Sequence, residues 1–229
     1  MTNSQNSKIE FVAEAGAPKL KEHVGIFRTT LTIIALLVGE FFALSYATEK
    51  FRIISTEDAR RLSIQEYPRQ IPAAASHDQS GGANNLADYL KSDGRVTIVN
   101  FIYTKCNAVC SVLGSEFQQL QQQILEQNLK KKIRLLSITF DERDRTDQLS
   151  AYAKRMRANT QIWNFLSIDN RSDRQKILTT FGVVAIPAPL DEFVHNAAFH
   201  VVDANGALVR VIDFDQAQTA INFAVSKTN

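Results

Sequence analysis

The chain holds only two cysteines, Cys106 and Cys110, in the segment Thr104-Lys-Cys-Asn-Ala-Val-Cys110. Thiols this close can attack a disulfide, pair with each other or bind a metal, because the thiolate is both nucleophile and ligand. Two cysteines are too few for a disulfide-dense scaffold or a four-cysteine zinc site. Their C-x-x-x-C spacing is one residue longer than the C-x-x-C of redox oxidoreductases. Spacing alone leaves metal binding, thiol–disulfide exchange and a structural disulfide open.

A third ligand would favour a metal site, and the candidates are the four histidines His23, His77, His195 and His200. His23 precedes an apolar segment and His77 lies in a loop-like stretch, so both are poor candidates. His195 comes just before a predicted terminal hairpin, and His200 lies in its first strand. Residues five apart in a regular strand face opposite sides, so these two should not share a site. Taken alone, either histidine is more often structural than a ligand.

The pattern around the cysteines predicts a strand followed by a helix. Residues 96–103 are β-branched and aromatic, which is typical of a strand, and residues 112–127 carry apolar side chains at helical spacing. The cysteines therefore lie at a strand–helix junction. A helix N-terminus offers unpaired N–H groups and partial positive charge, which favour thiolate. This placement makes an inert disulfide less favoured than chemistry at the sulfur atoms.

Strands and helices alternate through the rest of the chain. Strands are predicted at 133–140, 162–168, 197–202 and 208–212, and helices around Leu149–Met156, from a capping box at Ser172–Gln175 to Gly182, and at 217–225. The last two strands flank Asp203-Ala-Asn-Gly206, a hairpin signal. Residues 76–85 are predicted to form a loop. This order is that of an α/β, thioredoxin-like domain.

An apolar segment precedes that domain. Residues 29–48 hold a single charge, Glu40, and as a helix they would span about 30 Å, the thickness of a bilayer core. An acidic residue at the helix centre costs roughly 3 kcal/mol, which nine large apolar residues offset at about 0.3–0.6 kcal/mol each. We predict a single transmembrane anchor. A buried amphipathic helix and a cleaved signal sequence are the alternatives.

The predicted organisation is an N-terminal tail at 1–28, the transmembrane anchor at 29–48, a juxtamembrane linker at 49–75 and the thioredoxin-like domain at 76–229. Lysine and arginine total 26 against 24 acidic residues, a net charge of +2, so nothing indicates nucleic-acid binding. The N-terminal tail carries Glu10, Glu14 and Glu22 and is not rich in arginine, which argues against a mitochondrial transit peptide and favours an uncleaved bacterial anchor. Basic residues flank the anchor on both sides, so their count does not orient it.

Residues 68–229 resemble the Sco/SenC family of membrane-anchored, thioredoxin-like copper proteins, which assist cytochrome c oxidase assembly. The resemblance is carried by Phe101-Ile-Tyr-Thr104 before Cys106 and Cys110, by Asp141-Glu-Arg143-Asp144, and by a histidine before the last hairpin. Counting back from Asp203 places His195, and not His200, at the family's histidine. The chain departs from the family at Asn107 and Ser111, which replace prolines, and at Val194 and Asn196, which replace Asp and Ser.

The resemblance implies that Cys106, Cys110 and His195 bind copper, with Asp141 as a weaker candidate that tunes or orients the site. Two thiolates and an imidazole form a soft ligand set that suits Cu(I) and can also hold Cu(II). It also implies a bacterial inner-membrane protein whose C-terminal domain faces the periplasm. The departures leave all three ligands in place, and they bear on how rigidly the site is held.

Two functions follow from this resemblance and from the cysteine chemistry. In the first, the protein is a metallochaperone that receives copper from other carriers and passes it to the binuclear copper centre of cytochrome c oxidase subunit II, without enzymatic turnover. In the second, it is a membrane-tethered thiol–disulfide oxidoreductase that keeps target cysteines reduced, with Cys106 attacking and Cys110 resolving. Retention of His195 favours copper, because a dithiol reductase needs no histidine there. A peroxidase and a tethered domain with an inert disulfide are weaker alternatives.

Overall fold

The computed structural model describes residues 19–47, 55–105 and 109–228, and for residues 19–26, 56 and 109–113 it describes the backbone alone. The chain divides into two compact units, and the second begins at Ser55.

The first unit contains one long helix, α1 (Lys19–Ala47). Its apolar part, Phe27–Ala47, is long enough to cross a membrane, and none of the side chains there is buried within the protein. The Thr32 hydroxyl donates to the carbonyl of Arg28 at 2.9 Å, so this polar group is satisfied within the helix. The structure confirms the predicted helix, and the segment is a candidate transmembrane span.

The second unit is built on a sheet. Among the described residues this sheet has eight strands in the order β1-β10-β9-β4-β5-β6-β2-β3. The strands are β1 (Arg69–Gln70), β2 (Ala75–Asp78), β3 (Ala83–Asn85), β4 (Val96–Ile102), β5 (Ile133–Thr139), β6 (Trp163–Ile168), β9 (Ala198–Val202) and β10 (Ala207–Asp213). Strands β4, β5 and β6 are parallel, and β9 and β2 pair antiparallel on either side of them. The remaining strands, β7 (Ala185–Pro187) and β8 (Phe193–His195), form a separate two-stranded sheet.

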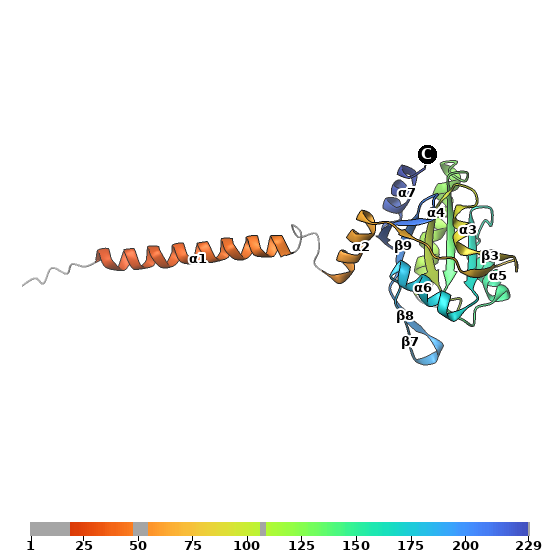
Figure 1. Cartoon of the computed structure of the whole chain (residues 1–229), viewed down its shortest axis with the longest axis horizontal. Helices are drawn as coiled ribbons and strands as arrows, with labels where there is room; N and C mark the ends of the chain where they lie inside the picture. The colour runs from red at the N-terminus through yellow and green to blue at the C-terminus, as the bar shows by residue number, and fades with distance from the viewer. Residues whose placement is uncertain (1–18, 48–54, 106–108, 229) are drawn as a thin grey trace, which may run out of the picture. The chain divides into compact units, whose positions relative to one another are not determined.

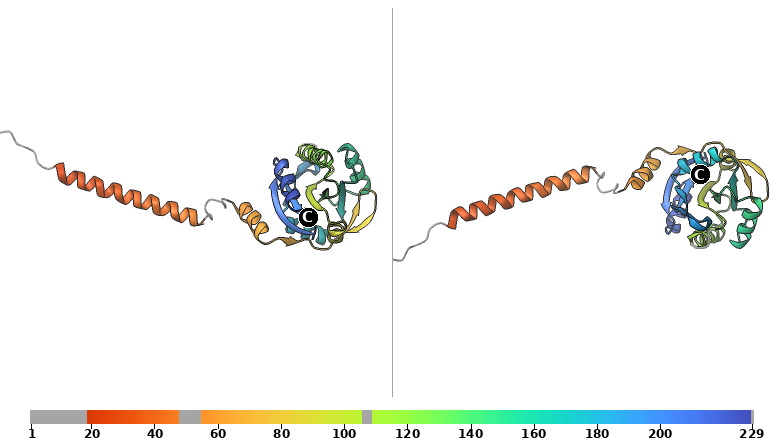
Figure 2. Two further views of the ribbon diagram at one scale, coloured as in Figure 1. Left: turned by 90° about the horizontal axis from the view of Figure 1, so that it is seen from above. Right: turned by 90° about the horizontal axis from the view of Figure 1, so that it is seen from below.

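Helices cover both faces of the sheet (Figures 1 and 2). One hydrophobic cluster packs α4 (Val109–Glu126), α5 (Thr146–Arg155) and α7 (Ala217–Ser226) on one face. The other cluster packs α2 (Thr56–Glu66), α3 (Leu86–Lys91) and α6 (Arg171–Phe181) on the opposite face. A short 3-10 turn, η1 (Pro189–Asp191), joins β7 to β8. The result is the three-layer arrangement expected of a mixed α/β domain.

Burial on both faces explains the sequence of the central strands. Every residue of β4 and β5 is buried, and alternate β4 residues belong to opposite clusters: Ile98 and Ile102 to one, Val99 and Phe101 to the other. Near-continuous apolar runs are typical of parallel strands covered on both faces. Trp163 of β6 is fully buried in the α4/α5/α7 cluster, and its indole Nε1 donates to the Ser137 hydroxyl at 2.9 Å.

The predicted long elements agree with the structure to within a few residues, but two local predictions are wrong. Helix α6 is capped by Asn170, whose side chain accepts from the backbone N–H groups of Ser172 and Asp173, so Ser172 does not open the helix. Residues 76–85, predicted as loop, contain most of the β2–β3 hairpin, which lengthens the sheet edge beside β6. Helix α2, within the segment predicted as linker, contributes Ile64 to the core of the domain.

The helix end predicted at Gly182 is confirmed, and it offers a test of the packing there. Gly182 has φ +71°, and a Cβ on it would overlap the Arg60 guanidinium, whose Nη1 donates to the Phe181 carbonyl at 2.8 Å. Gly94 has a similar φ, +69°, but open space around it. We expect Gly94→Ala to lower the free energy of unfolding by about 1 kcal/mol, from backbone strain alone. Gly182→Ala should cost roughly 1 kcal/mol more, because the Arg60 hydrogen bond is displaced as well. Urea unfolding followed by circular dichroism measures both, and equal losses would contradict the role given to Arg60.

Candidate metal centre

The chain is firmly held just before Cys106. The backbone N–H of Thr104 donates to Asp144 Oδ2 at 2.8 Å, and the Thr104 hydroxyl donates to Asp144 Oδ1. The Thr104 carbonyl accepts from Arg155 Nη2 at 2.9 Å. The residue two positions before Cys106 therefore has its backbone groups and its hydroxyl engaged, so the cysteine segment starts from a fixed point.

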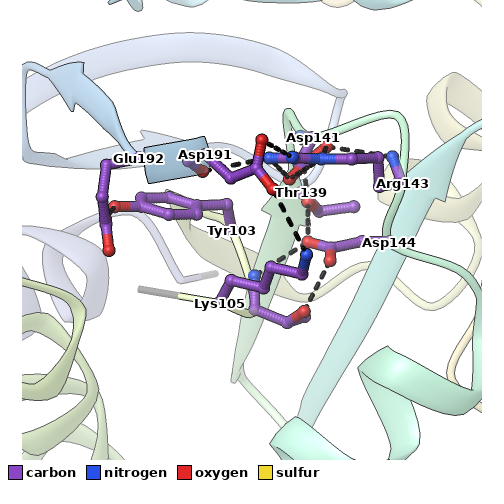
Figure 3. A network of polar contacts seen from close by, with 9 residues as sticks. Tyr103, Lys105, Thr139, Asp141, Arg143, Asp144, Asp191 and Glu192 are labelled. Carbon is purple, nitrogen blue, oxygen red and sulfur yellow. Dashed lines mark hydrogen bonds and ion pairs between the residues drawn. The ribbon is translucent and has the colours of Figure 1, made fainter. Parts of the chain in front are cut away.

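The same carboxylate also ties in the neighbouring strand. Asp144 is buried, and its Oδ2 accepts from the Thr139 hydroxyl at 2.6 Å. Thr139 is the last residue of β5, and Thr104 follows β4, so Asp144 joins the carboxyl ends of two central strands (Figure 3). Hydrogen bonds to a buried carboxylate are strong because little water competes for the donors.

The cysteines lie at the predicted junction. Cys106 falls outside the described residues, and of Cys110 the backbone alone is described, in the first turn of α4. Within the described residues, no three His, Cys, Asp or Glu side chains are grouped as a metal site would require. The copper ligand set predicted from the sequence therefore stays a prediction, and the structure describes the side chain of one of its members, His195.

The fold brings His195 to the edge of the sheet where the cysteine segment begins. His195 is the last residue of β8 and pairs with Ala185 of β7. Its ring lies with its centre 6.1 Å from that of Tyr103 and 5.1 Å from that of Phe140. Tyr103 follows β4 and Phe140 follows β5, so all three rings meet at the carboxyl ends of these strands. A segment distant in sequence thus reaches the residues that lead directly into Cys106.

The chemistry of His195 suits a metal ligand. Its Nδ1 lies 3.1 Å from the backbone carbonyl of Asn196, and its Nε2 is buried with no hydrogen-bond partner among the described residues. Burial lowers the pKa of this imidazole below its usual value, so the ring is neutral near pH 7. An Nδ1–H that donates to a carbonyl leaves the lone pair on Nε2, the arrangement found in many metal-bound histidines. The site residue that is described therefore fits a soft metal ion.

His200 has a different environment. It lies in β9 of the large sheet, with its ring edge-on to Phe101 and Phe181 at centroid distances of 5.5 and 5.3 Å. It is fully buried, and neither ring nitrogen has a hydrogen-bond partner in the described part of the chain. His200 and His195 thus belong to separate sheets. His77, for its part, pairs with Asp169 at 2.8 Å.

The carboxylate of Asp141, the secondary candidate, is paired with the side chain of Arg143. Its carboxylate accepts from the backbone N–H of Arg143 at 3.0 Å and from its guanidinium Nη2 at 2.8 Å. Burial alone would raise the pKa of Asp141, but the hydrogen bonds and charge of Arg143 outweigh it and hold the pKa below its usual value. Asp141 is therefore ionised and anchors Arg143.

Several polar contacts at this edge were not predicted from the sequence. Arg143 reaches Asp191 of η1, the Tyr103 hydroxyl contacts the Glu192 carboxylate, and Lys105 Nζ lies 3.8 Å from Asp191 Oδ2 (Figure 3). These partners are separated by more than forty residues in the chain. No spacing pattern in the sequence predicts contacts between residues so far apart. The one local signal for a charged cluster was the arginine among the acidic residues of the Asp141–Asp144 segment.

The fully buried His200 predicts a dependence of stability on pH. Burial lowers its pKa to about 3, whereas an unfolded histidine titrates near 6.5. Between these values the unfolded chain binds a proton that the folded domain excludes, so stability falls as the pH is lowered, by up to about 1.4 kcal/mol per pH unit. In His200→Phe this contribution should disappear, giving a shallower decline between pH 6.5 and 4. Urea unfolding across that range checks it, and identical slopes in the two proteins would contradict it.

These features define a class of protein: a thioredoxin-like domain with a candidate metal centre at the carboxyl ends of its central strands. The chain belongs to the SCO1/SenC family, whose model matches residues 77–228, more than half of the chain.

Similar proteins agree with that membership. The SCO1 protein homolog of Bacillus subtilis (strain 168) is 26% identical over 132 residues, which cover 56% of this chain and 66% of that protein. The chain thus spans just under two thirds of that relative's length. A SCO1/SenC family lipoprotein from Bacillus anthracis superposes with a TM-score of 0.62 at 21% identity, over 70% of this chain and 97% of the other. Copper-bound ScoI from Arabidopsis thaliana gives a TM-score of 0.58 at 15% identity, over 68% and 97%. At these identities the two structures establish the fold.

Proposed function

We propose that the protein is a copper-binding metallochaperone that assists assembly of the binuclear copper centre of cytochrome c oxidase. Its ligands are the thiolates of Cys106 and Cys110 and the imidazole Nε2 of His195. The observation that carries this proposal is the environment of His195: a neutral ring whose Nε2 is buried and free of any partner in the described residues. Membership of the SCO1/SenC family and the copper-bound relative from Arabidopsis thaliana support the choice of metal.

The chain's own residues determine how copper, as cargo, is held. Tyr103 and Phe140 pack against the His195 ring and keep water from it, which favours a neutral ligand. The Asn196 carbonyl holds the Nδ1 proton, so that Nε2 is the donor atom. Two soft thiolates with an imidazole prefer Cu(I) and also accept Cu(II). Transfer then proceeds by exchange of these ligands for the thiolates of the receiving protein, with no turnover in the enzymatic sense.

The place of action follows from the same proposal. Helix α1 anchors the chain in the bacterial inner membrane, and the domain that begins at Ser55 faces the periplasm. Its partners there are copper carriers and cytochrome c oxidase subunit II. The periplasm permits reversible disulfides, so the two cysteines can also be oxidised between cycles.

The second candidate is the membrane-tethered thiol–disulfide oxidoreductase. It is favoured by one observation: α4 begins at Val109, which puts Cys110 in the first helical turn. The helix dipole there lowers a thiol pKa, which favours the thiolate with which Cys110 would resolve a mixed disulfide. In this reaction the Cys106 thiolate attacks a disulfide of the target protein and releases one target thiol. Cys110 then attacks the mixed disulfide, so the target gains two thiols and this chain gains the Cys106–Cys110 disulfide.

An anaerobic Cu(I) titration of the reduced full-length chain in detergent micelles, against a competing chelator, tests the first candidate. We expect one tight equivalent, weakened by about tenfold or more in Cys106→Ala, Cys110→Ala and His195→Ala, since even residues that only support a metal ligand change affinity by about tenfold to a hundredfold. His200→Ala is the matched control: it removes a histidine of the same domain that lies in the other sheet, and it should leave copper affinity nearly intact.

The opposite result would favour the oxidoreductase. Weak copper binding that is indifferent to His195→Ala, together with a Cys106–Cys110 disulfide whose potential lies near that of thioredoxin, about −270 mV, would contradict the metallochaperone. That result would also assign a change of function to the residues that depart from the family pattern, such as Asn107 and Val194.

A further inference from the structure

The hairpin that carries His195 is attached to the domain by side chains. In the described part of the chain, β7 and β8 pair with each other and with no strand of the eight-stranded sheet. Figure 1 shows this hairpin extending beyond the edge of the domain. Segments with few buried apolar contacts open at lower free energy than core strands do. The position of His195 therefore depends on a small number of contacts along the hairpin.

The tip of the hairpin has a strained backbone. Leu190 and Asp191 have φ of 64° and 61°, both in the left-handed region that favours glycine. The Leu190 side chain is 94% exposed, so no burial of its own offsets the strain. Backbone of this kind persists where neighbouring groups hold it in place, and such residues gather at functional sites.

Arg143 contacts the tip most closely: Lys105 Nζ lies farther from Asp191, at 3.8 Å, and the Tyr103 hydroxyl contacts the next residue, Glu192. The Arg143 guanidinium Nη1 lies 3.0 Å from Asp191 Oδ1, and its Nη2 donates to the Asp191 backbone carbonyl at 3.1 Å. The same guanidinium lies 5.7 Å above the ring of Phe193 in β8. Figure 3 shows Arg143 with dashed contacts to both Asp141 and Asp191. The Arg143 side chain thus contacts the strained turn at two points, the carboxylate and the backbone carbonyl of Asp191.

Arg143 is itself fixed from the sheet. The buried Asp141 carboxylate accepts from its backbone N–H, its Nε and its Nη2, and the Asp141 N–H donates to the Thr139 hydroxyl at the end of β5. The planar guanidinium suits this task, because it can bond two carboxylates in fixed directions, whereas a lysine ammonium cannot. A continuous set of polar contacts therefore runs from β5 through Asp141 and Arg143 to Asp191.

The base of the hairpin is closed separately, by Asn196. Its Oδ1 accepts from the Val184 N–H at 2.8 Å, and its Nδ2 donates to the Gly182 carbonyl at 3.0 Å. His195 precedes Asn196 and lies between these two attachments, one at the base and one at the tip. With the base tied, the hairpin is kept on the ring cluster of Tyr103 and Phe140 by two things: the tip contact, and the packing of Phe193 against these rings at centroid distances of 5.2 and 5.3 Å.

We propose that Arg143 is a positioning residue that acts through Asp191: it pins the tip of the hairpin and thereby fixes the direction of His195 Nε2. The consequence of this contact for copper rests on the proposed function, because the contact sets how firmly His195, the third copper ligand, is held in place. The exposed Arg143–Asp191 pair is a weak interaction, so it can hold the ligand while still allowing the hairpin to open when the cargo is handed over.

Asp191→Asn is the test variant. Asparagine tolerates the left-handed backbone and keeps the main-chain carbonyl, so the change removes the charge with little effect on the turn. Glu142→Gln is the matched control. Glu142 is a neighbouring carboxylate of similar exposure, 65% against 68%, paired at 3.0 Å with Arg174 of α6, and the ion pairs found for it do not reach the hairpin. Both variants lose one negative charge at the same edge of the domain.

Three measurements on the full chain in detergent micelles compare the variants. Without copper, hydrogen exchange is measured at the Ala188 amide, which bonds Glu192 across the turn at 2.8 Å, and the tautomer of His195 is followed by imidazole nitrogen NMR. With Cu(I), affinity is measured against a chelator. We expect Asp191→Asn to speed exchange at Ala188 and weaken Cu(I) by about two- to fivefold each, the range that an exposed ion pair can give. Glu142→Gln should change neither, and exchange in β4 should be the same in all three proteins.

The outcomes separate this proposal from the proposed function. If Asp191→Asn leaves the exchange of Ala188 and the His195 signal as in the unmutated chain, or if Glu142→Gln matches its effect, the role of Arg143 is overturned. If the unmutated chain binds no copper, the proposed function fails. The exchange and NMR data obtained without copper then still test whether Arg143 holds the hairpin. A double variant adds Arg143→Lys: it should speed exchange at Ala188 less after Asp191→Asn than in the unmutated chain, because the contact to the Asp191 carboxylate is already lost and only the contact to the Asp191 carbonyl remains to be broken.

Discussion

A single buried carboxylate organises the functional edge of this domain. Asp144 takes hydrogen bonds from the backbone and hydroxyl of Thr104 and from the hydroxyl of Thr139, and so joins the chain where it leaves β4 to where it leaves β5. Losing the hydrogen bonds from either threonine would leave the buried carboxylate with fewer donors, which costs more than losing an exposed pair. Everything nearby is placed relative to that junction: the cysteine segment on one side, and on the other the arginine that reaches the hairpin.

The two histidines near the end of the chain show how environment decides chemistry. His200 is fully buried and His195 is partly buried, and both are neutral near pH 7. His200 stands between the rings of Phe101 and Phe181 in the middle of a layered core, where an ion of any size would have to displace packed side chains. His195 lies on a hairpin outside the main sheet, with one nitrogen bonded to a carbonyl and the other buried with no partner among the described residues. The family resemblance separates the two histidines by position, and burial together with hydrogen bonding gives the physical difference between them.

Much of the architecture follows from periodicity. Runs such as Val96–Ile102 and Ile133–Thr139 are buried throughout and mostly apolar because both faces are covered, and this pattern predicts central strands. The junction that holds the cysteines follows from the same argument. Elements of two to four residues, such as β1 and β3, carry too little pattern to be predicted. The contact between Arg143 and Asp191 joins residues 48 apart, and only the folded chain brings them together. The cap at Asn170 was missed because Ser172 also fits the capping pattern.

The placement of the one tryptophan has a practical consequence. Trp163 is fully enclosed by the cluster around α4, α5 and α7, with its indole N–H bound to Ser137, on the face opposite α6. Its fluorescence will therefore report whether the core is folded, and its emission should not change when the hairpin moves. Tyr103 sits beside His195 and contacts Glu192, so ultraviolet signals of tyrosine, and not of tryptophan, are the optical probe with access to the metal-binding edge.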